Sequence, residues 1–218
     1  MSANYPYLHS IYIGQPKTIV DGRGEWQSSI YRNLVDGPIL LEARGLVGDK
    51  ATQPYHGTPE LAVCCHFLDH YRFWNERYPM QLQPGNVGEN WTLENISEEE
   101  ICIGDIYCVG AALVQVSAPR SPCENQARRI GRADWVKLTL QELRTGIYLR
   151  VLEPGVVQAG DIFELTERLN PGKTIPQLNH CWYHVFDTNL AQEFTTMPGL
   201  MRWWQQRFAE RLVGVQMQ

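Results

Sequence analysis

Residues 112 to 123 read ALVQVSAPRSPC, a strand-like run that ends in a loop bounded by prolines. Apolar and polar side chains alternate up to residue 118, which predicts a β-strand with one buried face. Two prolines then restrict the backbone on either side of Arg120 and Ser121. This stretch predicts a strand followed by a rigid loop that fixes the direction of the Cys123 thiol.

Similar short alternations fill the first three quarters of the chain. They span residues 8–14, 28–35, 39–45, 60–67, 90–96, 147–153 and 161–167. Asp36-Gly37-Pro38 predicts a hairpin connection between the second and third of these runs, and Glu153-Pro154-Gly155 predicts another turn. Many short strands separated by turn residues favour a mainly β fold, a barrel or a sandwich.

Helical spacing of apolar residues occurs in three places. It predicts a helix over about 68–78, which ends before Pro79, and a second near 134–144. After Pro171 and Gly172 the strand pattern stops and helical spacing continues. We therefore expect a β-barrel domain over residues 1–168 and a small helical tail domain over residues 169–218.

The aromatic stripe in the tail has two interpretations. Trp203, Trp204 and Phe208 could form an interaction surface, but a stripe at helical spacing is more often part of a core.

Composition narrows the class of protein. Of the 218 residues, 44% are hydrophobic and 20% charged, as in ordinary globular proteins. A net charge of -5 argues against a broad basic surface, so no nucleic-acid partner is expected. The sequence lacks a secretory segment and an apolar run long enough to span a membrane, and its six cysteines form no CxxC pair. We expect a cytoplasmic protein with reduced thiols and no membrane partner.

Several common catalytic motifs are missing from the sequence. His66 and His70 are predicted to lie four residues apart on one helix, the spacing of zinc ligands, but Phe67 stands where a metalloprotease carries glutamate. We interpret both histidines as packing or capping residues. The sequence contains neither a phosphate-binding GxxxxGK[ST] loop, nor GxGxxG after a strand, nor a GxSxG elbow.

Local composition leaves two interpretations of Cys123. An isolated cysteine is most often a small packing residue. A reactive thiolate instead needs nearby positive charge and some exposure, and Arg120, Arg128 and Arg129 could supply the charge.

Five polar landmarks follow strand-like runs in a characteristic order. They are GLVGDK at 45–50, HGTPELAV at 56–63, GEN at 88–90, IGD at 103–105 and PRSPC at 119–123. Their order and intervals resemble the MOSC domain, the family named after the C-terminal part of molybdenum cofactor sulfurases, and in particular its YiiM-type bacterial members. The similarity continues through residues 145–161 and into RWWQQRFAERL at 202–212, which resembles the three-helix C-terminal extension of that subgroup.

The resemblance implies a β-barrel that binds the molybdenum cofactor, molybdopterin. It implies that Cys123 carries the molybdenum centre or a transferable sulfur, and that Arg120 either faces the anionic phosphate of the pterin or lowers the pKa of the thiol. The other residues expected around this pocket are Ser121, His56, Glu89 and Asn90. For His56, cofactor binding and the fixing of a turn are equally open. Pyridoxal phosphate binding is a further association of the family.

The chain departs from the family pattern at two positions. Thr58 stands where a second glycine is common, and Asn125 stands where lysine is common. Losing the lysine removes a cation from the expected anion site, so either Arg128 or Arg129 compensates or the cofactor binds less tightly.

Three functions are compatible with these residues. The leading hypothesis is a molybdenum-dependent oxidoreductase with Cys123 as the metal ligand, which reduces N-hydroxylated bases or related N-oxygenated small molecules. Because no nicotinamide or flavin motif is recognisable, its electrons would come from a separate reductase partner. The alternatives are a sulfur carrier with a Cys123 persulfide, and a non-catalytic module whose helical tail docks a partner.

Overall fold

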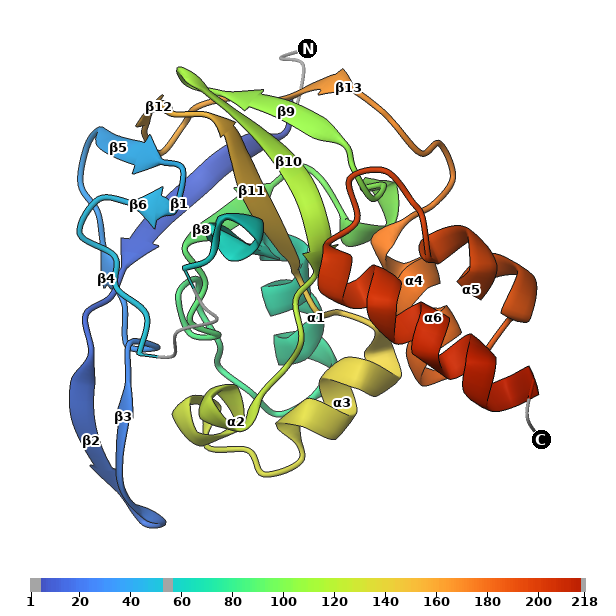
Figure 1. Cartoon of the computed structure of the whole chain (residues 1–218). Helices are drawn as coiled ribbons and strands as arrows, with labels where there is room; N and C mark the ends of the chain where they lie inside the picture. The colour runs from blue at the N-terminus through green and yellow to red at the C-terminus, as the bar shows by residue number, and fades with distance from the viewer. Residues whose placement is uncertain (1–4, 53–56, 217–218) are drawn as a thin grey trace.

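The strand predicted from residues 112–119 lies near the middle of an eight-stranded sheet (Figure 1). The computed structural model describes residues 5–52 and 57–216. The sheet has the order β13-β9-β10-β11-β7-β8-β1-β4, and its pairs are antiparallel except β7 with β8. Its strands are β1 (Tyr7–Ile13), β4 (Asn33–Leu34), β7 (Val63–Phe67), β8 (Trp91–Glu94), β9 (Ile106–Val109), β10 (Ala112–Pro119), β11 (Ile147–Glu153) and β13 (Phe163–Glu167).

The sheet curls so that its distant strands meet. Tyr7 forms an antiparallel bridge with Ile162, and the Leu8 amide donates to the Asp161 carbonyl over 2.8 Å. Apolar side chains from the strands, such as Leu8 and Val114, are fully buried between the walls. The predicted mainly β, barrel-like fold is confirmed.

One crossover interrupts the antiparallel pattern. Strand β7 is buried along its whole length and is followed by α1 (Leu68–Arg77), which leads towards the parallel strand β8. Helix α1 matches the helix predicted over 68–78. The prediction that His66 and His70 share that helix is wrong, because His66 lies on β7 and only His70 lies on α1. Their rings still meet, edge to face, with centroids 4.8 Å apart.

The predicted hairpin across residues 36–38 is wrong. Strand β4 pairs with β1, whereas β5 (Ile39–Glu42) pairs with β12 (Gly155–Val157) and β6 (Gly45–Leu46). Pairing with strands distant in sequence therefore replaces the local hairpin. A separate ribbon, not predicted from sequence, is formed by β2 (Lys17–Asp21) and β3 (Gly24–Ser28) and extends away from the barrel (Figure 1).

Two short helices follow the PRSPC loop. Helix α3 (Trp135–Glu142) lies within the predicted 134–144 range, whereas α2 (Glu124–Ile130) was not predicted from its polar sequence. Cys123 is the N-cap of α2, and its backbone amide donates to Oε1 of Gln126 over 3.3 Å. Gly131 ends the helix in the left-handed region at φ 76°.

Around the IGD landmark, the sequence predicts a strand pair with Cys102 and Cys108 as structural members, and this prediction needs one correction. Cys108 lies on β9, but Cys102 forms only an isolated bridge with Thr174, so the two do not belong to one strand pair.

The tail consists of α4 (Ile175–Tyr183), α5 (Thr188–Phe194) and α6 (Arg202–Gln216), which lie together against one side of the barrel (Figure 1). Their buried side chains join those of the barrel in one apolar cluster. Trp204 and Phe208 belong to that cluster, while Trp203 is 47% exposed. The stripe is thus core at two positions and surface at the third.

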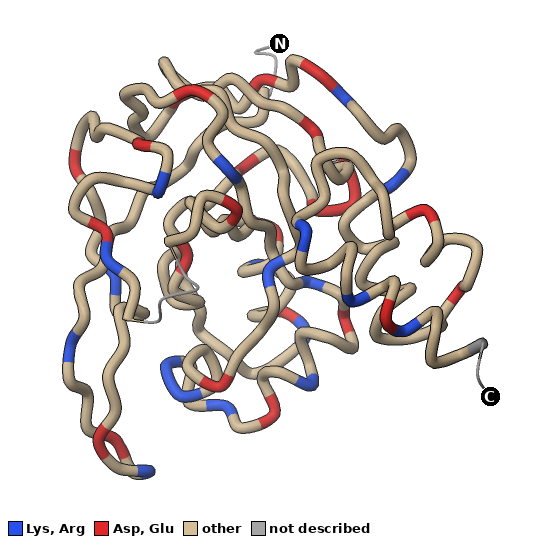
Figure 2. The backbone as a smooth tube through the Cα atoms, in the orientation of Figure 1, with Lys and Arg blue, Asp and Glu red and all other residues tan. Residues whose placement is uncertain are grey.

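Charged residues are scattered over the whole backbone (Figure 2). Among the described residues, no helix has the length and apolar character needed to cross a membrane.

Candidate functional site

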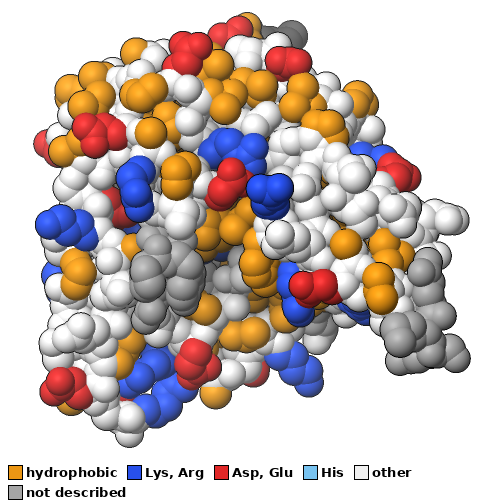
Figure 3. All heavy atoms as spheres, in the orientation of Figure 1, with side chains coloured by type: hydrophobic (Ala, Val, Ile, Leu, Met, Phe, Trp, Pro, Cys, Tyr) orange, Lys and Arg blue, Asp and Glu red, His pale blue; other side chains and the backbone are white. Residues whose placement is uncertain are grey.

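A cavity of about 510 Å³ lies beside the ends of β10 and β7. Its wall combines residues from the end of the β2–β3 ribbon, the segment after β6, the loop before β8, the PRSPC loop and the start of α6. The face shown in Figure 3 is hollowed near its centre, with hydrophobic side chains in the wall. A cavity of this size holds a drug-sized ligand or an organic cofactor.

Arg120 contributes a buried positive charge to this cavity. Its backbone amide donates to the Gly146 carbonyl over 2.8 Å, which fixes the residue where β10 ends. Its side chain is 6% exposed, and Nη2 donates to the carbonyls of Val87 and Gly88 over 2.8 and 3.2 Å. Within residues 5–52 and 57–216, Nη1 has no hydrogen-bond partner and no carboxylate forms an ion pair with this guanidinium.

A second guanidinium in the cavity wall is already neutralised. Arg32 pairs with Asp49, the aspartate of the first GD landmark, with 3.1 Å between Nη2 and Oδ2. Arg32 also donates to the Gly88 carbonyl, as Arg120 does. Arg32 thus has Asp49 as its ion-pair partner, whereas among the described carboxylates Arg120 has only the more distant attraction of the buried Glu89. Because a buried guanidinium without a direct ion pair is costly, the arrangement suits an anionic ligand that contacts Arg120.

Arg120 keeps its positive charge in this environment. Burial disfavours its charge, but the nearby Cys64 and Tyr148 favour it, and the net effect raises the pKa of Arg120 above its ordinary value. The guanidinium therefore stays cationic at every pH of interest.

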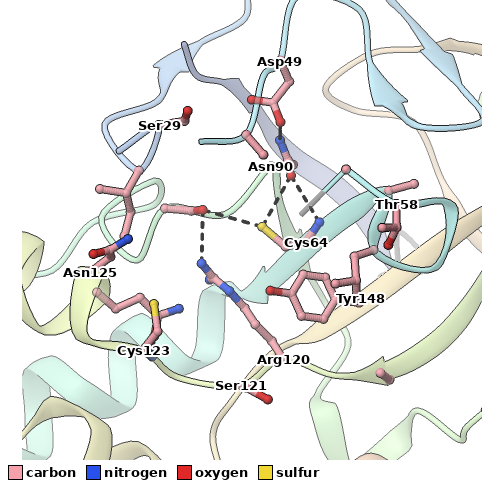
Figure 4. Close-up of a pocket in the computed structure, with 18 of the residues that line it drawn as sticks. Ser29, Asp49, Thr58, Cys64, Asn90, Arg120, Ser121, Cys123, Asn125 and Tyr148 are labelled. Atoms are coloured by element: carbon pink, nitrogen blue, oxygen red, sulfur yellow. Dashed lines mark hydrogen bonds between the residues drawn. The ribbon is translucent and has the colours of Figure 1, made fainter. Parts of the chain in front are cut away.

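Cys123 is exposed and lines the same cavity (Figure 4). Its backbone is held by Oε1 of Gln126, which also accepts from Nε1 of the buried Trp135 over 3.3 Å. The thiol thus stands on a loop whose backbone is fixed by packing beneath it. Ser121, two residues earlier, is exposed and also lines the cavity.

Asn90 lies in the wall with its amide occupied by the protein. Nδ2 donates to the Tyr12 carbonyl and to Asp49, and Oδ1 accepts from the amide of Cys64 over 3.2 Å. The structure therefore gives Asn90 a role in ordering the wall.

Glu89 does not line the cavity. Its Oε1 accepts from Tyr71, Thr92 and the amide of Gly85, at distances of 2.5, 2.8 and 2.6 Å. His56, the remaining predicted site residue, lies outside the described residues. The structure thus brings Cys123, Arg120, Ser121 and Asn90 to one cavity.

Neither arginine expected to replace the missing lysine lines the cavity. Arg128 forms an ion pair with Asp21 of the ribbon, and Arg129 donates to the Asn86 carbonyl. The two positions that depart from the family pattern, Thr58 and Asn125, are both in the wall.

Sequence reasoning missed a second thiol in the cavity. Cys64 Sγ donates to Oδ1 of Asn90 over 3.4 Å and to the Gly88 carbonyl over 3.6 Å (Figure 4). The next residue, Cys65, is fully buried in the barrel core, and burial raises its pKa well above the ordinary value. Strand alternation in VCCHF was the signal that could have separated the two thiols.

Ser29 is a further missed residue. It lies in the wall, is 5% exposed, and its hydroxyl has no hydrogen-bond partner in the part of the chain that the structure describes. Together with Nη1 of Arg120, it offers a ligand two unused hydrogen-bond donors.

Comparison with known proteins places this geometry in a family. The family model for the MOSC domain matches residues 52–164. YflK of Bacillus subtilis, named as an uncharacterized protein, is 35% identical over 80% of each chain. YiiM of Escherichia coli is 29% identical over 94% of this chain and 92% of its own.

Two further relatives extend the comparison. A protein of Gibberella moniliformis named "Reductase" is 38% identical over 80% of this chain, which corresponds to 32% of that longer protein. The crystal structure of YiiM from Geobacillus stearothermophilus is similar with a TM-score of 0.82 and 33% identity, over 95% of this chain and 99% of that one. The chain belongs to the MOSC domain family, and YiiM and YflK are among its relatives.

Proposed function

We propose that this protein is a molybdenum-cofactor oxidoreductase that reduces N-hydroxylated bases or related N-oxygenated compounds, with Cys123 as the protein ligand to the metal. The observation that carries the proposal is the meeting, in one cavity, of an exposed thiol and a buried guanidinium whose Nη1 has no hydrogen-bond partner among the described residues. The MOSC family and the relative named as a reductase support it at the level of cofactor and reaction class.

The residues present fit the cofactor's chemistry. Within residues 5–52 and 57–216, no group of three or more His, Cys, Asp or Glu side chains could hold a metal ion. A metal bound here would therefore bring most of its ligands with it, as it does in a pterin dithiolene, and take one soft ligand from Cys123. Arg120 and Ser29 supply donors suited to the anionic part of such a cofactor.

Each side chain then has a role that follows from its position. Arg120 binds the anion as a fixed cation, because its backbone and Nη2 are already held by carbonyls. Asp49 keeps Arg32 neutralised, and Asn90 joins Asp49 to the β7 backbone. The loop of Cys123 is held by Gln126, so the thiol needs little reorganisation on binding.

When bound, the molybdenum cofactor supplies the two-electron chemistry of the reaction. An N-hydroxylated amine takes up two electrons and two protons, the N–O bond breaks, and the products are the amine and water. We infer that the electrons come from a separate reductase and that the protein is cytoplasmic.

The proposal is tested by Cys123→Ser. Cells lacking the endogenous protein, but able to make the cofactor, carry wild type or variant, and reduction of an N-hydroxylated base is measured. We expect activity and the molybdenum content of the purified chain to fall at least about 100-fold, since replacing residues that only support a metal ligand already costs about 10–100-fold.

Cys108→Ser is the matched control, because Cys108 lies on β9 and does not line the cavity. It should retain wild-type activity and metal content. Wild-type activity and normal molybdenum in Cys123→Ser would show that the thiol is not the ligand.

A sulfur carrier is the second candidate, because the exposed Cys123 thiol would also suit a persulfide. Under that function, mass spectrometry of the wild-type chain would find one labile sulfur on Cys123, and activity would not follow molybdenum content.

A further inference from the structure

The helical tail contributes a tryptophan to the wall of the cavity. Met201, Trp203 and Trp204, at the start of α6, line it together with residues of the PRSPC loop. The amide of Met201 donates to the Ser117 carbonyl of β10 over 2.7 Å. This bond ties the residue just before α6 to the strand that leads into Arg120, so the barrel fixes the point at which the helix with both tryptophans begins.

The two neighbouring tryptophans differ in burial. Trp204 is 2% exposed and packs in the core, whereas Trp203 is 47% exposed. Their rings meet edge to face, with centroids 5.1 Å apart and planes at 85°. Trp204 therefore supports Trp203 without stacking on it. The Arg207 guanidinium lies 5.7 Å from the centroid of the Trp203 ring.

An indole that is half exposed at a cavity leaves apolar surface in contact with water. An indole buried in a core does not, so only the exposed one gains by covering that surface with a ligand. An indole stacks well on planar rings, and a cation beside it adds to the attraction for electron-rich partners. The rest of the wall supplies the anion site at Arg120 but no comparably exposed aromatic surface among the described residues.

We propose that Trp203 is the stacking surface of this cavity for a planar heteroaromatic ring, and that the tail thereby sets which molecules the site accepts. The inference rests on the proposed function only in assuming that the cavity holds a small molecule. Two sources could provide the ring: the base of the substrate or the pterin of the cofactor.

The test measures binding by the chain purified without molybdenum cofactor. Isothermal titration uses three probes: N-hydroxylated adenine, a reduced pterin, and acetohydroxamic acid, which has an N–O bond but no ring. For Trp203→Ala we expect the dissociation constant of at least one ring probe to rise about tenfold, the usual size of a lost base–aromatic stack. The hydroxamate should bind with unchanged affinity.

Two variants of the same helix serve as comparisons. Trp203→Phe keeps an aromatic ring and should recover most of the affinity. Val213→Ala removes an exposed side chain of α6 that does not line the cavity, and should match wild type. A loss confined to the adenine probe identifies the substrate ring, and a loss confined to the pterin identifies the cofactor ring.

The probes are titrated into the chain without molybdenum, so this test and the test of the metal ligand fail independently. Ring binding that depends on Trp203 would stand even if Cys123→Ser kept its molybdenum and its activity. The inference is overturned if no ring probe binds the wild-type chain, if Trp203→Ala binds both ring probes like wild type, or if it loses affinity for the hydroxamate to the same extent.

Discussion

Two adjacent thiols on β7 have different environments because strand side chains alternate between faces. Cys64 lines the cavity, while Cys65 is fully buried in the barrel core. We predict that a small alkylating reagent labels Cys64 in the native protein at least about ten times faster than Cys65, because Cys65 reacts only after local opening. Peptide mass spectrometry after timed labelling measures both rates.

The chain unfolded in urea is the control for that experiment, since both thiols should then react at similar rates. Equal labelling in the native protein would mean that β7 does not separate the two side chains.

Site residues could be predicted where one short stretch of sequence carries both the functional groups and the prolines that restrain the backbone. PRSPC alone indicates a thiol and a cation on a restrained loop, and both reach the cavity. Arg32 and Ser29 could not be predicted, because they follow the β2–β3 ribbon, for which the sequence pattern gives no signal. Glu89 lies one residue from Asn90 in sequence, yet its side chain turns towards Tyr71 and away from the cavity.

Helices α2 and α3 and the crossover helix α1 meet in a small second core. Trp74 of α1 and Trp135 of α3 pack with ring centroids 4.9 Å apart, and Trp135 is 1% exposed. Nε1 of Trp135 also donates to Gln126, which holds the backbone of Cys123. This packing therefore positions the loop that carries the thiol.

We predict that Trp135→Ala destabilises the fold by about 3–5 kcal/mol, the usual cost of truncating a buried tryptophan. Trp203→Ala should cost less than about 1 kcal/mol, because that side chain is half exposed. Urea denaturation followed by circular dichroism compares the two variants with wild type. Similar losses in both would contradict the burial difference.

At the scale of elements, segments with strong periodicity could be predicted and those defined by long-range pairing could not. Strand β10 and helix α1 follow directly from their patterns. The turn at 36–38 forms no hairpin, because its flanking segments find partners in β1 and β12. Helix α2 is polar and short, so its periodicity gives no signal; its cap and packing define it.

The barrel and the tail are joined by an apolar cluster and by a buried polar junction. The junction consists of the hydrogen-bonded side chains of Glu98, Thr145 and Asn179. Glu98 is 2% exposed, and it accepts from Thr145 Oγ1 over 2.7 Å. Asn179 of α4 donates to the same hydroxyl over 2.9 Å, which links the tail to this junction. The domain boundary between residues 168 and 169 stays a prediction, and the shared cluster shows that the two parts bury apolar side chains against each other.

The junction also makes the stability of the whole chain depend on pH. Burial raises the pKa of Glu98 from 4.5 to about 8, against the opposing effects of Thr145, Gly146 and Arg144. His70 lies 3.3 Å from Glu98, and burial holds the pKa values of His66 and His70 well below 6.5. Near neutral pH the Glu98 carboxyl is therefore protonated and both rings are uncharged.

The sign of the effect follows from counting protons. Between pH 4.5 and about 8 the folded chain keeps the Glu98 proton that the unfolded chain releases, so stability falls as the pH rises through this window. The two histidines act in the opposite direction, but only below their ordinary pKa of 6.5. Between pH 6.5 and 8 the change of stability with pH therefore comes from Glu98 and not from the two histidines.

We predict that wild type loses about 1–2 kcal/mol of unfolding free energy relative to Glu98→Gln when the pH rises from 6.5 to 8, because glutamine keeps the shape of the side chain but cannot ionise. Urea denaturation of both proteins at the two pH values measures the difference. Glu99→Gln, on the exposed neighbour, should follow wild type at both. If Glu98→Gln shows the same pH dependence as wild type, this carboxyl does not hold a proton in the folded chain, and the junction would instead have to accommodate a buried negative charge between barrel and tail.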